Sequence, residues 1–367
     1  MLRNLQALRA LAALLVVFDH LNGELSYDKS STTLFSGFRY IGNFGVDIFF
    51  AISGFIMLST TWSHFAEPGA SRVFLIRRLA RIYPPYWLVL APIVLTYLFA
   101  SRSLMRSHAG HSDIVSSMLL LPQANTSLLI VSWTLVFEMY FYLVFAAIMS
   151  RPRRWFFPGL GVWLALEIAM STFFARASNP YLGFLASPLA IEFMLGALVG
   201  YAYVSKRMPF ALPALVAGSL AAFGVWFASL TPGLAADLTK NDITRVLQFG
   251  LPAALLVYGL VGLERRSVRL APAWSVHLGD ASYALYLWHV PVTIVFGALA
   301  FRARVHGALP DVLVQLVTLG TVVGVSLVVY RFFELPVTSY LNRRFAPRRG
   351  STGRQAPSSI LAPSGQP

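Results

Sequence analysis

The chain has 367 residues, of which 57% are hydrophobic and 12% are charged, with a formal net charge of +14 and no cysteine. The charged fraction is about half of the ~25% that is usual in soluble domains, so the composition excludes an ordinary water-soluble fold. The absence of cysteine excludes disulfides, thiolate metal sites and a cysteine nucleophile. Because the basic residues lie between apolar runs, we attribute them to membrane topology rather than to nucleic-acid binding.

Several runs of about 20 apolar residues are long enough to cross a bilayer as helices, since a backbone in lipid must satisfy its own hydrogen bonds. The first run has the basic start of a signal peptide, but Asp19 and His20 stand where a cleavage site would need small residues. We therefore interpret it as a retained span. The sequence predicts an all-α polytopic membrane helix bundle of about ten transmembrane helices. The predicted spans are 5–21, 41–60, 83–100, 132–149, 155–174, 187–204, 211–230, 246–263, 281–300 and 312–333.

The basic residues also predict how the bundle is oriented. An even number of spans places both termini on one side, and most of the 29 Lys and Arg residues lie in the connections on that side. Cytoplasmic connections are enriched in Lys and Arg, so we expect both termini to be cytoplasmic. The longest connection, 101–131, then faces outward. Its apolar stretch 114–121 is a candidate interfacial element on the acceptor side.

Two further patterns concern domain organisation and packing. We expect a single transmembrane domain over residues 1–342, followed by a cytoplasmic tail, 343–367, that is basic and then rich in Ser and Pro, a composition typical of disorder. The other connections are too short to hold a soluble domain, so the working residues must lie in the bundle. Pairs of glycines four residues apart indicate close helix packing, at positions 196/200 and 320/324.

The first predicted span carries two polar residues that lie on one face. Arg9 and His20 are eleven residues apart, which is about three full turns of helix and about 16 Å along its axis. With a cytoplasmic N-terminus, Arg9 lies near the cytosolic boundary and His20 lies toward the outer leaflet. Ionisable groups in a bilayer are costly and are functional candidates. The alternative for His20 is an interfacial residue at a helix end.

Two carboxylates are predicted at the same membrane depth as His20. Asn43 and Asp47 share a face of the second span, and Glu138 lies on the fourth span, each carboxylate about 9 Å below the outer end of its helix. A histidine beside a carboxylate is a usual arrangement for a general base near neutral pH. The alternative for each carboxylate is a structural partner for an arginine or a backbone donor.

A cluster of arginines precedes the third span. Arg78 and Arg81 are three residues apart, with Arg77 beside them, and on a helical turn their guanidinium groups would suit phosphate oxygens. On composition alone such a cluster is more often a topological anchor on the cytoplasmic side. Its placement also suits the nucleotide of a cytosolic donor.

The remaining polar groups in the predicted spans allow simpler explanations. His289, at mid-depth in the ninth span, is either a second proton-transfer group or a packed structural histidine. Glu334 follows Arg331 by three residues, so a local ion pair accounts for it. His108 and His111, in the outer connection, lack further plausible metal ligands, and we predict no metal site.

Taken together, these motifs resemble those of the integral-membrane acyltransferase family 3, especially members associated with exopolysaccharide modification. The resemblance covers essentially the whole chain, and it depends on the order and spacing of the motifs rather than on any one of them. They are LQALR at 5–9 with DH at 19–20, GVDIFFAISGF at 45–55, RRLARIYP at 77–84, WTLVFE at 133–138, SYALYLWH at 282–289 and ELP at 334–336.

The resemblance implies transfer of an acyl group, commonly acetyl, from cytosolic acyl-CoA to a carbohydrate hydroxyl in a bacterial cytoplasmic (inner) membrane. It implies that His20 is essential, that Arg9 is its family partner, and that Arg78 and Arg81 are the paired arginines. Acyl-CoA is then a donor substrate, and no tightly bound cofactor is expected. Some family members append a soluble hydrolase-like domain, for which we expect no room here after Phe333. A separate polysaccharide-assembly protein would then deliver the acceptor.

The mechanistic hypothesis is that Arg78 and Arg81, assisted by Arg9 or Arg77, hold the CoA phosphates. The pantetheine arm then extends toward His20. His20 acts as a general base on the glycan hydroxyl, with Glu138 or Asp47 orienting the imidazolium, or it becomes transiently acetylated. We predict supporting roles at the substrate for four more residues, which are Asn43, Trp133, Tyr142 and His289. The alternative function is a transporter or flippase for a glycan, which also places ionisable residues inside apolar helices. A membrane sensor is a weaker alternative.

Overall fold

A computed structural model describes residues 2–24, 34–38, 41–99, 112–175, 177–230, 243–303 and 308–345 of the chain. All regular structure within these ranges is helical. Ten helical segments are long and apolar enough to cross a membrane. The predicted all-α polytopic bundle of about ten spans is therefore confirmed.

The helices follow the predicted spans closely, with short additional helices between some of them. Two π-helical turns interrupt the eighth and tenth spans. The α-helices are α1 (Arg3–Glu24), α2 (Gly42–Thr61), α3 (Ala70–Phe99), α4 (Ile114–Leu119), α5 (Trp133–Met149), α6 (Phe156–Phe173), α7 (Pro180–Leu185), α8 (Ala190–Val204), α9 (Ala211–Ser229), α11 (Ile243–Arg245), α12 (Leu251–Arg265), α13 (Ala273–Asp280), α14 (Ser282–Arg302), α15 (Ala308–Val329) and α16 (Leu335–Arg344). The π-helical turns are η6 (Val246–Gly250) and η7 (Tyr330–Glu334).

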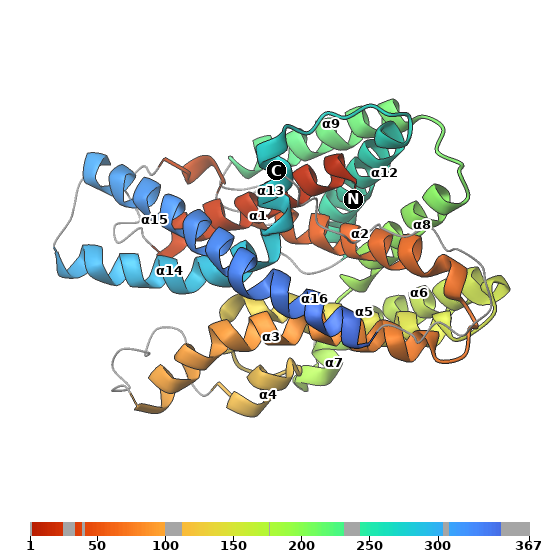
Figure 1. The fold of residues 1–367 in the computed structure, drawn as a ribbon, viewed down its shortest axis with the longest axis horizontal. Helices are drawn as coiled ribbons and strands as arrows, with labels where there is room; N and C mark the ends of the chain where they lie inside the picture. Colours follow the sequence, from red (N-terminus) through yellow and green to blue (C-terminus); the bar gives the residue numbers. More distant parts are fainter. Residues whose placement is uncertain are drawn as a thin grey trace.

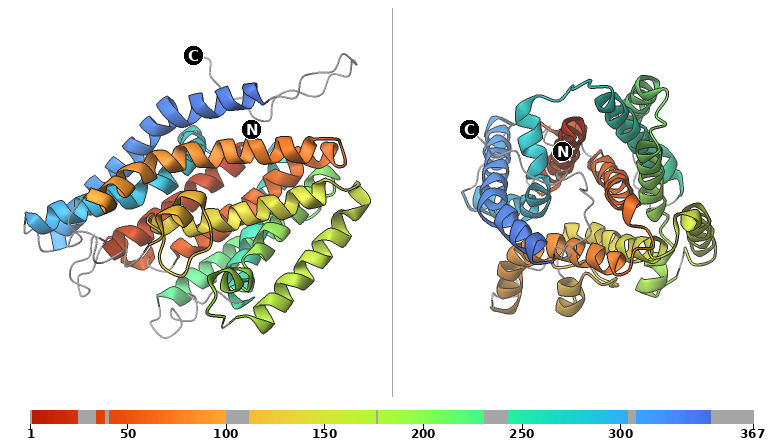
Figure 2. Two further views of the ribbon diagram at one scale, coloured as in Figure 1. Left: turned by 90° about the horizontal axis from the view of Figure 1, so that it is seen from below. Right: turned by 45° about the vertical axis from the view of Figure 1, so that its right-hand side comes forward.

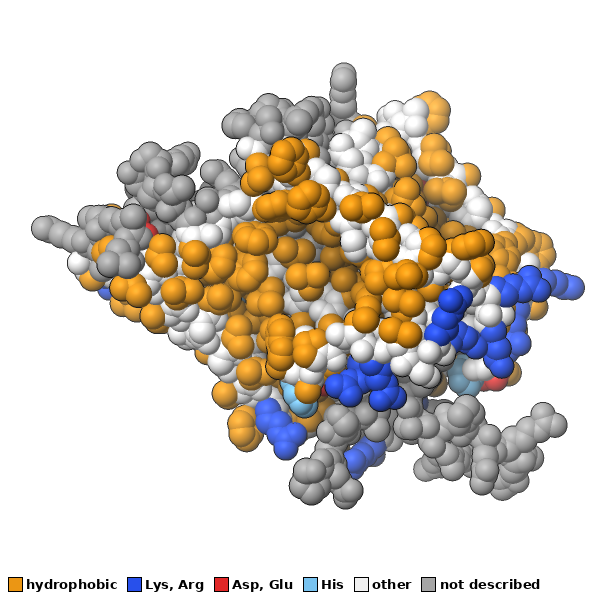
Figure 3. All heavy atoms as spheres, turned by 90° about the horizontal axis from the view of Figure 1, so that it is seen from above, with side chains coloured by type: hydrophobic (Ala, Val, Ile, Leu, Met, Phe, Trp, Pro, Cys, Tyr) orange, Lys and Arg blue, Asp and Glu red, His pale blue; other side chains and the backbone are white. Residues whose placement is uncertain are grey.

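The long helices run roughly side by side, and α1 and α2 lie inside a ring formed by the others (Figure 1; Figure 2, right). α1 and α2 are mostly buried, whereas α6, α9 and α15 are mostly exposed. Large apolar side chains cover the outer surface of these peripheral helices. Figure 3 shows one such apolar face, with Lys and Arg side chains gathered along its lower and right edges. A wide apolar surface bounded by basic residues is the surface expected in a bilayer.

Glycines allow α2 and α8 to pack backbone against backbone. A Cβ atom added to Gly196 would lie 2.0 Å from the Ala51 carbonyl oxygen, and one added to Gly54 would lie 2.0 Å from the Phe193 carbonyl oxygen. The prediction of close packing at Gly196 is confirmed. It is wrong for Gly320 and Gly324, because a Cβ atom added to either would meet nothing within 4 Å; both face outward from α15.

α3 begins 13 residues before the predicted third span, at Ala70. The arginine cluster therefore belongs to this helix rather than to a connection, and the helix continues through Pro84, Pro85 and Pro92. Neighbouring helices can satisfy the backbone groups that such prolines release in a membrane helix. The apolar stretch predicted at the interface forms α4, which packs against the middle of α3. Its carbonyl oxygens accept hydrogen bonds from three α3 side chains, Tyr83, Tyr86 and Trp87.

Proline explains the two π-helical turns. Pro252 and Pro336 each stand at the second position of the helix that follows the turn, and each lacks the N–H that would donate one turn back. The preceding residue donates five residues back instead: Leu251 N–H bonds to the Val246 oxygen and Leu335 N–H to the Tyr330 oxygen. The last span consequently continues as α16, through Arg344, alongside the first part of α3 (Figure 2, left). The predicted tail from residue 346 onward lies outside the described residues.

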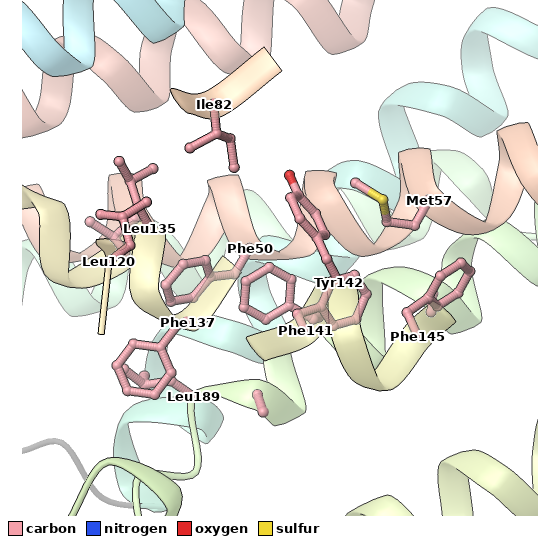
Figure 4. Packing of buried hydrophobic residues seen from close by; sticks show 14 of the residues in the cluster. Phe50, Met57, Ile82, Leu120, Leu135, Phe137, Phe141, Tyr142, Phe145 and Leu189 are labelled. Carbon is pink, nitrogen blue, oxygen red and sulfur yellow. The ribbon is translucent and has the colours of Figure 1, made fainter. Parts of the chain in front are cut away.

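Aromatic side chains form the centre of the largest apolar cluster, between α2, α5 and α8. The Phe193 ring stacks on Phe50 and on Phe141, with centroid separations of 4.4 and 4.3 Å. Tyr142 belongs to the same cluster, but Figure 4 shows its hydroxyl pointing away from these rings toward Ile82 on α3. The core thus presents one polar atom to the space between α3 and α5.

Candidate active site

Two adjacent cavities, which share part of their lining, occupy the space between α1, α2, α3, α5, α14 and α16. The outer one, here called the basin, is the larger and is bounded by the end of α2, the start of α3, and α16. The inner one, here called the chamber, is narrow and lies between α2, α3, α5 and α14. Arg9, Arg78 and Arg81 line both cavities.

Contacts from distant elements fix the start of α1 and thereby place Arg9. The Glu264 carboxylate accepts hydrogen bonds from the Arg3 and Asn4 backbone N–H groups, at 2.6 and 2.8 Å, and so caps the positive end of the helix. One turn on, Gln6 donates to Asp280 on α13 and accepts from the Arg9 guanidinium at 2.9 Å. Arg9 is therefore held in a buried position facing the junction of the two cavities.

The three junction arginines lack carboxylate partners. Arg78 packs beside the Phe74 and Tyr142 rings, at 5.5 and 5.9 Å from their centroids. Within the described ranges neither Arg78 nor Arg81 makes a hydrogen bond or ion pair, and Arg9 bonds only to an amide oxygen. Guanidinium groups left unpaired around a cavity constitute an anion site. Arg77, by contrast, lines only the basin.

Acidic residues also face the basin, so its charge is balanced in part. Asp280 and Glu334 line it near the junction, and the Glu334 carboxylate interacts with the charges of Arg9 and Arg81 without a direct ion pair to either. The local ion pair of Glu334 with Arg331 that the spacing suggested is not formed. The turn η7 carries Glu334 into the basin instead.

Polar side chains of the chamber lie deeper than the arginines. Glu138 accepts hydrogen bonds from the Ser53 hydroxyl, at 3.1 Å, and from the Tyr142 hydroxyl. The Thr134 and Tyr286 hydroxyls are 2.7 Å apart. Their neighbours in the chamber wall are mostly apolar, as Figure 4 illustrates with Phe50, Met57 and Leu135. The chamber therefore suits a ligand that is largely uncharged.

His20 is half-buried near the end of α1 away from Arg9, and it lines neither cavity. Its Nδ1 lies 2.9 Å from the Val16 carbonyl oxygen. A carbonyl oxygen only accepts, so Nδ1 carries a hydrogen in this contact, and Nε2 of the neutral ring keeps its lone pair. That tautomer leaves Nε2 available as a base or nucleophile. No carboxylate within the described ranges bonds to His20.

His289 lies between His20 and the chamber. The His20 and His289 rings meet edge to face, with centroids 4.8 Å apart, and the His289 ring lies 5.8 Å from the Tyr286 ring. His289 is fully buried, and neither ring nitrogen has a hydrogen-bond partner in the described part of the chain. Tyr286 in turn packs 6.1 Å from Phe49. These aromatic rings separate His20 from the chamber.

Asp47 has a different partner from the one that its depth suggested. Its two carboxylate oxygens accept hydrogen bonds from the Arg245 guanidinium, at 3.0 and 3.2 Å, and both side chains are fully buried. Glu192 on α8 lies beside this pair. The geometry of Asp47 therefore matches the alternative role considered for it, a structural partner for an arginine. Arg245 itself was not predicted as an internal residue, because it precedes the apolar run of the eighth span.

Replacing Asp47 with alanine is expected to lower the free energy of unfolding by about 3–5 kcal/mol, because the buried Arg245 guanidinium would lose both hydrogen bonds to the Asp47 carboxylate. Thermal unfolding of the purified protein in detergent measures this loss. The double variant Asp47→Ala with Arg245→Met should recover much of it, since the buried guanidinium is removed together with the carboxylate that it binds. A single variant as stable as the parent would contradict the structural role of the pair.

The other predicted site residues are spread around this centre. Tyr142 lines the chamber. Asn43 lies on α2 one turn before Asp47 and lines neither cavity. The Trp133 ring faces the Arg245 guanidinium, with its centroid 5.9 Å away. His108 and His111 lie outside the described residues.

The fold and the site define a polytopic membrane protein with a cationic cavity that leads into a mainly apolar chamber. Comparison with known families then identifies the class of enzyme: an acyltransferase domain matches residues 2–331. The chain belongs to the integral-membrane acyltransferase family 3. The resemblance predicted from the motifs is thus confirmed.

Individual relatives support O-acetyltransferase activity. The exopolysaccharide production protein ExoZ of Rhizobium meliloti is 33% identical over 324 residues, which cover 85% of this chain and 93% of that protein. The peptidoglycan O-acetyltransferase OatA of Listeria monocytogenes is 22% identical over 79% of this chain and 49% of its own length. A putative O-acetyltransferase of Staphylococcus aureus is 24% identical over 90% and 56%. The chain thus spans about half the length of these two relatives. No solved structure matches it.

Proposed function

We propose that this protein transfers an acetyl group from cytosolic acyl-CoA to a hydroxyl of an exopolysaccharide or another cell-surface glycan, in a bacterial cytoplasmic membrane. The observation that carries the proposal is the set of three arginines, Arg9, Arg78 and Arg81, without carboxylate partners at the junction of the two cavities. Guanidinium groups suit phosphate oxygens, and CoA carries phosphates at one end of a long, largely uncharged arm. The cavities match this arrangement, because cationic residues lie at their junction and the chamber beyond it is mainly apolar.

In this proposal the CoA nucleotide occupies the basin and the acyl-pantetheine arm enters the chamber. Arg77, which lines the basin alone, assists with the phosphates. Arg9 and His20 lie eleven residues apart on one helix, about 16 Å along its axis. The extended pantetheine arm is of comparable length. The acyl end therefore reaches the level of His20 when the phosphates lie at the junction.

His20 is the group we assign to the chemistry. In the direct route, its Nε2 takes the proton of the glycan hydroxyl while the hydroxyl oxygen attacks the thioester carbonyl carbon. The carbon–sulfur bond then breaks, and the departing thiolate takes the proton back from the imidazolium, which yields CoA and the acetyl ester. The hydrogen bond from Nδ1 to the Val16 oxygen keeps the ring in the required tautomer.

In the relay route, Nε2 itself attacks the thioester and the thiolate leaves, so that His20 carries the acetyl group. The glycan hydroxyl then attacks this group, its proton passes to the thiolate or to water, and the imidazole is regenerated. Either route requires the rings of Phe49, Tyr286 and His289 to move enough for the acyl group to meet His20. We assign the acceptor to the side of the bundle near His20, where a polysaccharide-assembly protein would deliver it.

Labelled acetyl-CoA incubated with the purified protein and candidate glycans tests the proposal. The expected result is label in the glycan that mild base releases, as an ester requires, with a matching amount of free CoA. A glycan transporter or flippase would move the saccharide across vesicles without forming an ester. Transport without ester formation would overturn the proposal.

A further inference from the structure

The chamber contains a buried hydroxyl that the proposed chemistry does not use. Ser282 is the first residue of α14, and it is fully buried in the chamber wall. Its Oγ has no hydrogen-bond partner within the described ranges, and the helix N-terminus has no side-chain cap. A buried hydroxyl without a partner costs free energy, so its position on a cavity wall indicates a ligand that supplies one.

Glu138 faces the same chamber from α5. Its Oε1 already accepts from Ser53 and Tyr142, whereas its Oε2 accepts no hydrogen bond within the described part of the chain. Neither arginine nor histidine bonds to this carboxylate. An ionised carboxylate only accepts hydrogen bonds. The chamber thus offers a hydroxyl donor on one element and a carboxylate acceptor on another.

These two groups occupy an intermediate position along the cavity. Ser282 and Glu138 line the chamber but not the basin, so they lie deeper than the arginines that line both. Ser282 and His289 are seven residues apart on α14, about 10 Å along the helix axis. Ser282 is therefore too far from His20 and His289 to contact the reacting carbonyl. It is also beyond the point where the arginines would hold phosphate.

We propose that Ser282 and Glu138 bind the amide groups of the pantetheine arm, an inference that rests on acyl-CoA being the donor. The arm carries amide N–H groups, which donate, and amide carbonyl oxygens, which accept. The Glu138 carboxylate receives an N–H, and the Ser282 hydroxyl donates to a carbonyl. This assignment gives Glu138 a role in positioning the donor, since it does not contact His20, and it accounts for the unpaired Oγ.

A phosphate suits the arginines that the chamber shares with the basin better than it suits the wall formed by Ser282 and Glu138. A phosphate beside Glu138 would place two negative groups together in a mainly apolar space, where their repulsion is weakly screened. The carboxylate of Glu334 also interacts with the Ala284 backbone N–H, in the first turn of α14, so that part of the helix terminus already has an anion. A neutral amide is not repelled by Glu138 or Glu334. It can form hydrogen bonds with both the Ser282 hydroxyl and the Glu138 carboxylate.

The variant Ser282→Ala distinguishes binding of the pantetheine arm from binding of the nucleotide. Isothermal titration of the full-length protein compares CoA with adenosine 3′,5′-bisphosphate, which carries phosphates but no pantetheine. We expect CoA affinity to fall about tenfold, because an arm amide loses a buried partner, and bisphosphate affinity to stay within about twofold of the parent. Unchanged bisphosphate binding also demonstrates a folded arginine junction. Ser275→Ala is the matched control, since this buried α13 serine lines neither cavity.

The outcomes distinguish this inference from the proposed function. If the parent binds CoA and Ser282→Ala binds it equally well, the assignment to the arm is overturned while the donor assignment survives. If the variant loses CoA and bisphosphate to the same extent, the hydroxyl does not act on the arm, and the inference is again overturned. If the parent binds neither ligand, acyl-CoA is not the donor and both proposals fail.

Discussion

Replacement of His20 by alanine is expected to reduce acetyl transfer to the glycan by about 10²- to 10⁴-fold, the usual contribution of a positioned general base. The loss should appear in kcat, with CoA affinity close to that of the parent, because His20 lines neither the basin nor the chamber. The initial rate of label incorporation from acetyl-CoA measures the first quantity. Calorimetric titration with CoA measures the second.

A matched control distinguishes chemistry from folding. His277 is an exposed histidine on α13 that lines neither cavity, so His277→Ala should retain the parent's rate. The two variants should also insert and unfold like the parent. Full activity in a correctly folded His20→Ala protein would remove the assigned chemistry.

The second large effect is expected at the junction arginines. Substituting Arg78 and Arg81 together with alanine should weaken CoA binding at least a hundredfold, because each guanidinium is assigned a charge-assisted hydrogen bond to phosphate worth about 1.5–3 kcal/mol. Affinity for adenosine 3′,5′-bisphosphate should fall in parallel, whereas glycan binding should change little. Titration of each ligand separately measures these differences.

Arg72 provides the control on the same helix. It is exposed and lines neither cavity, so Arg72→Ala removes one positive charge at the same end of α3 without touching the junction. Its CoA affinity should stay within about twofold of the parent, a difference of roughly 0.4 kcal/mol. Equal weakening by Arg72→Ala would mean that general positive charge, and not the junction, attracts the donor.

Apolar run length predicted the number of spans, since length and composition decide whether a helix can cross a bilayer. It predicted the ends less well. Four arginines lower the hydropathy of 70–82, yet this segment is the first part of α3. The last apolar run also ends at Phe333, whereas the helix continues into α16 through a π-helical turn. In both places packing between α3 and α16 extends the helices beyond their apolar runs.

Depth along a helix can be calculated from sequence, but the direction of a side chain around the axis depends on its neighbours. Asp47 and Glu138 were predicted at the level of His20. In the structure Asp47 faces Arg245 from the eighth span, and Glu138 faces the chamber. The sequence offered one usable signal for Arg245, a lone arginine at the start of an apolar run. Its pairing with Asp47 depends on how the helices pack, which run length and spacing do not predict.

The neighbouring positions of Arg78 and Arg81 could be predicted from spacing because both residues lie on one helix. Arg78 and Arg81 are neighbours on any α-helix, and both line the junction as that spacing requires. Arg9 was predicted to assist them, and the packing of α1 against α13 and α14 brings it to the same junction. Ser282 opens the SYALYLWH motif, but its lack of a hydrogen-bond partner becomes visible only when its surroundings are known.

Acetyl transfer across a sealed membrane tests the central claim most directly. The purified protein is reconstituted into proteoliposomes, with labelled acetyl-CoA supplied only on the side of the basin and the glycan only on the side near His20, and a C-terminal tag reports the orientation. We expect acetyl ester on the glycan, formed across the bilayer and lost with His20→Ala. Ester formation only when donor and glycan share one compartment would contradict it.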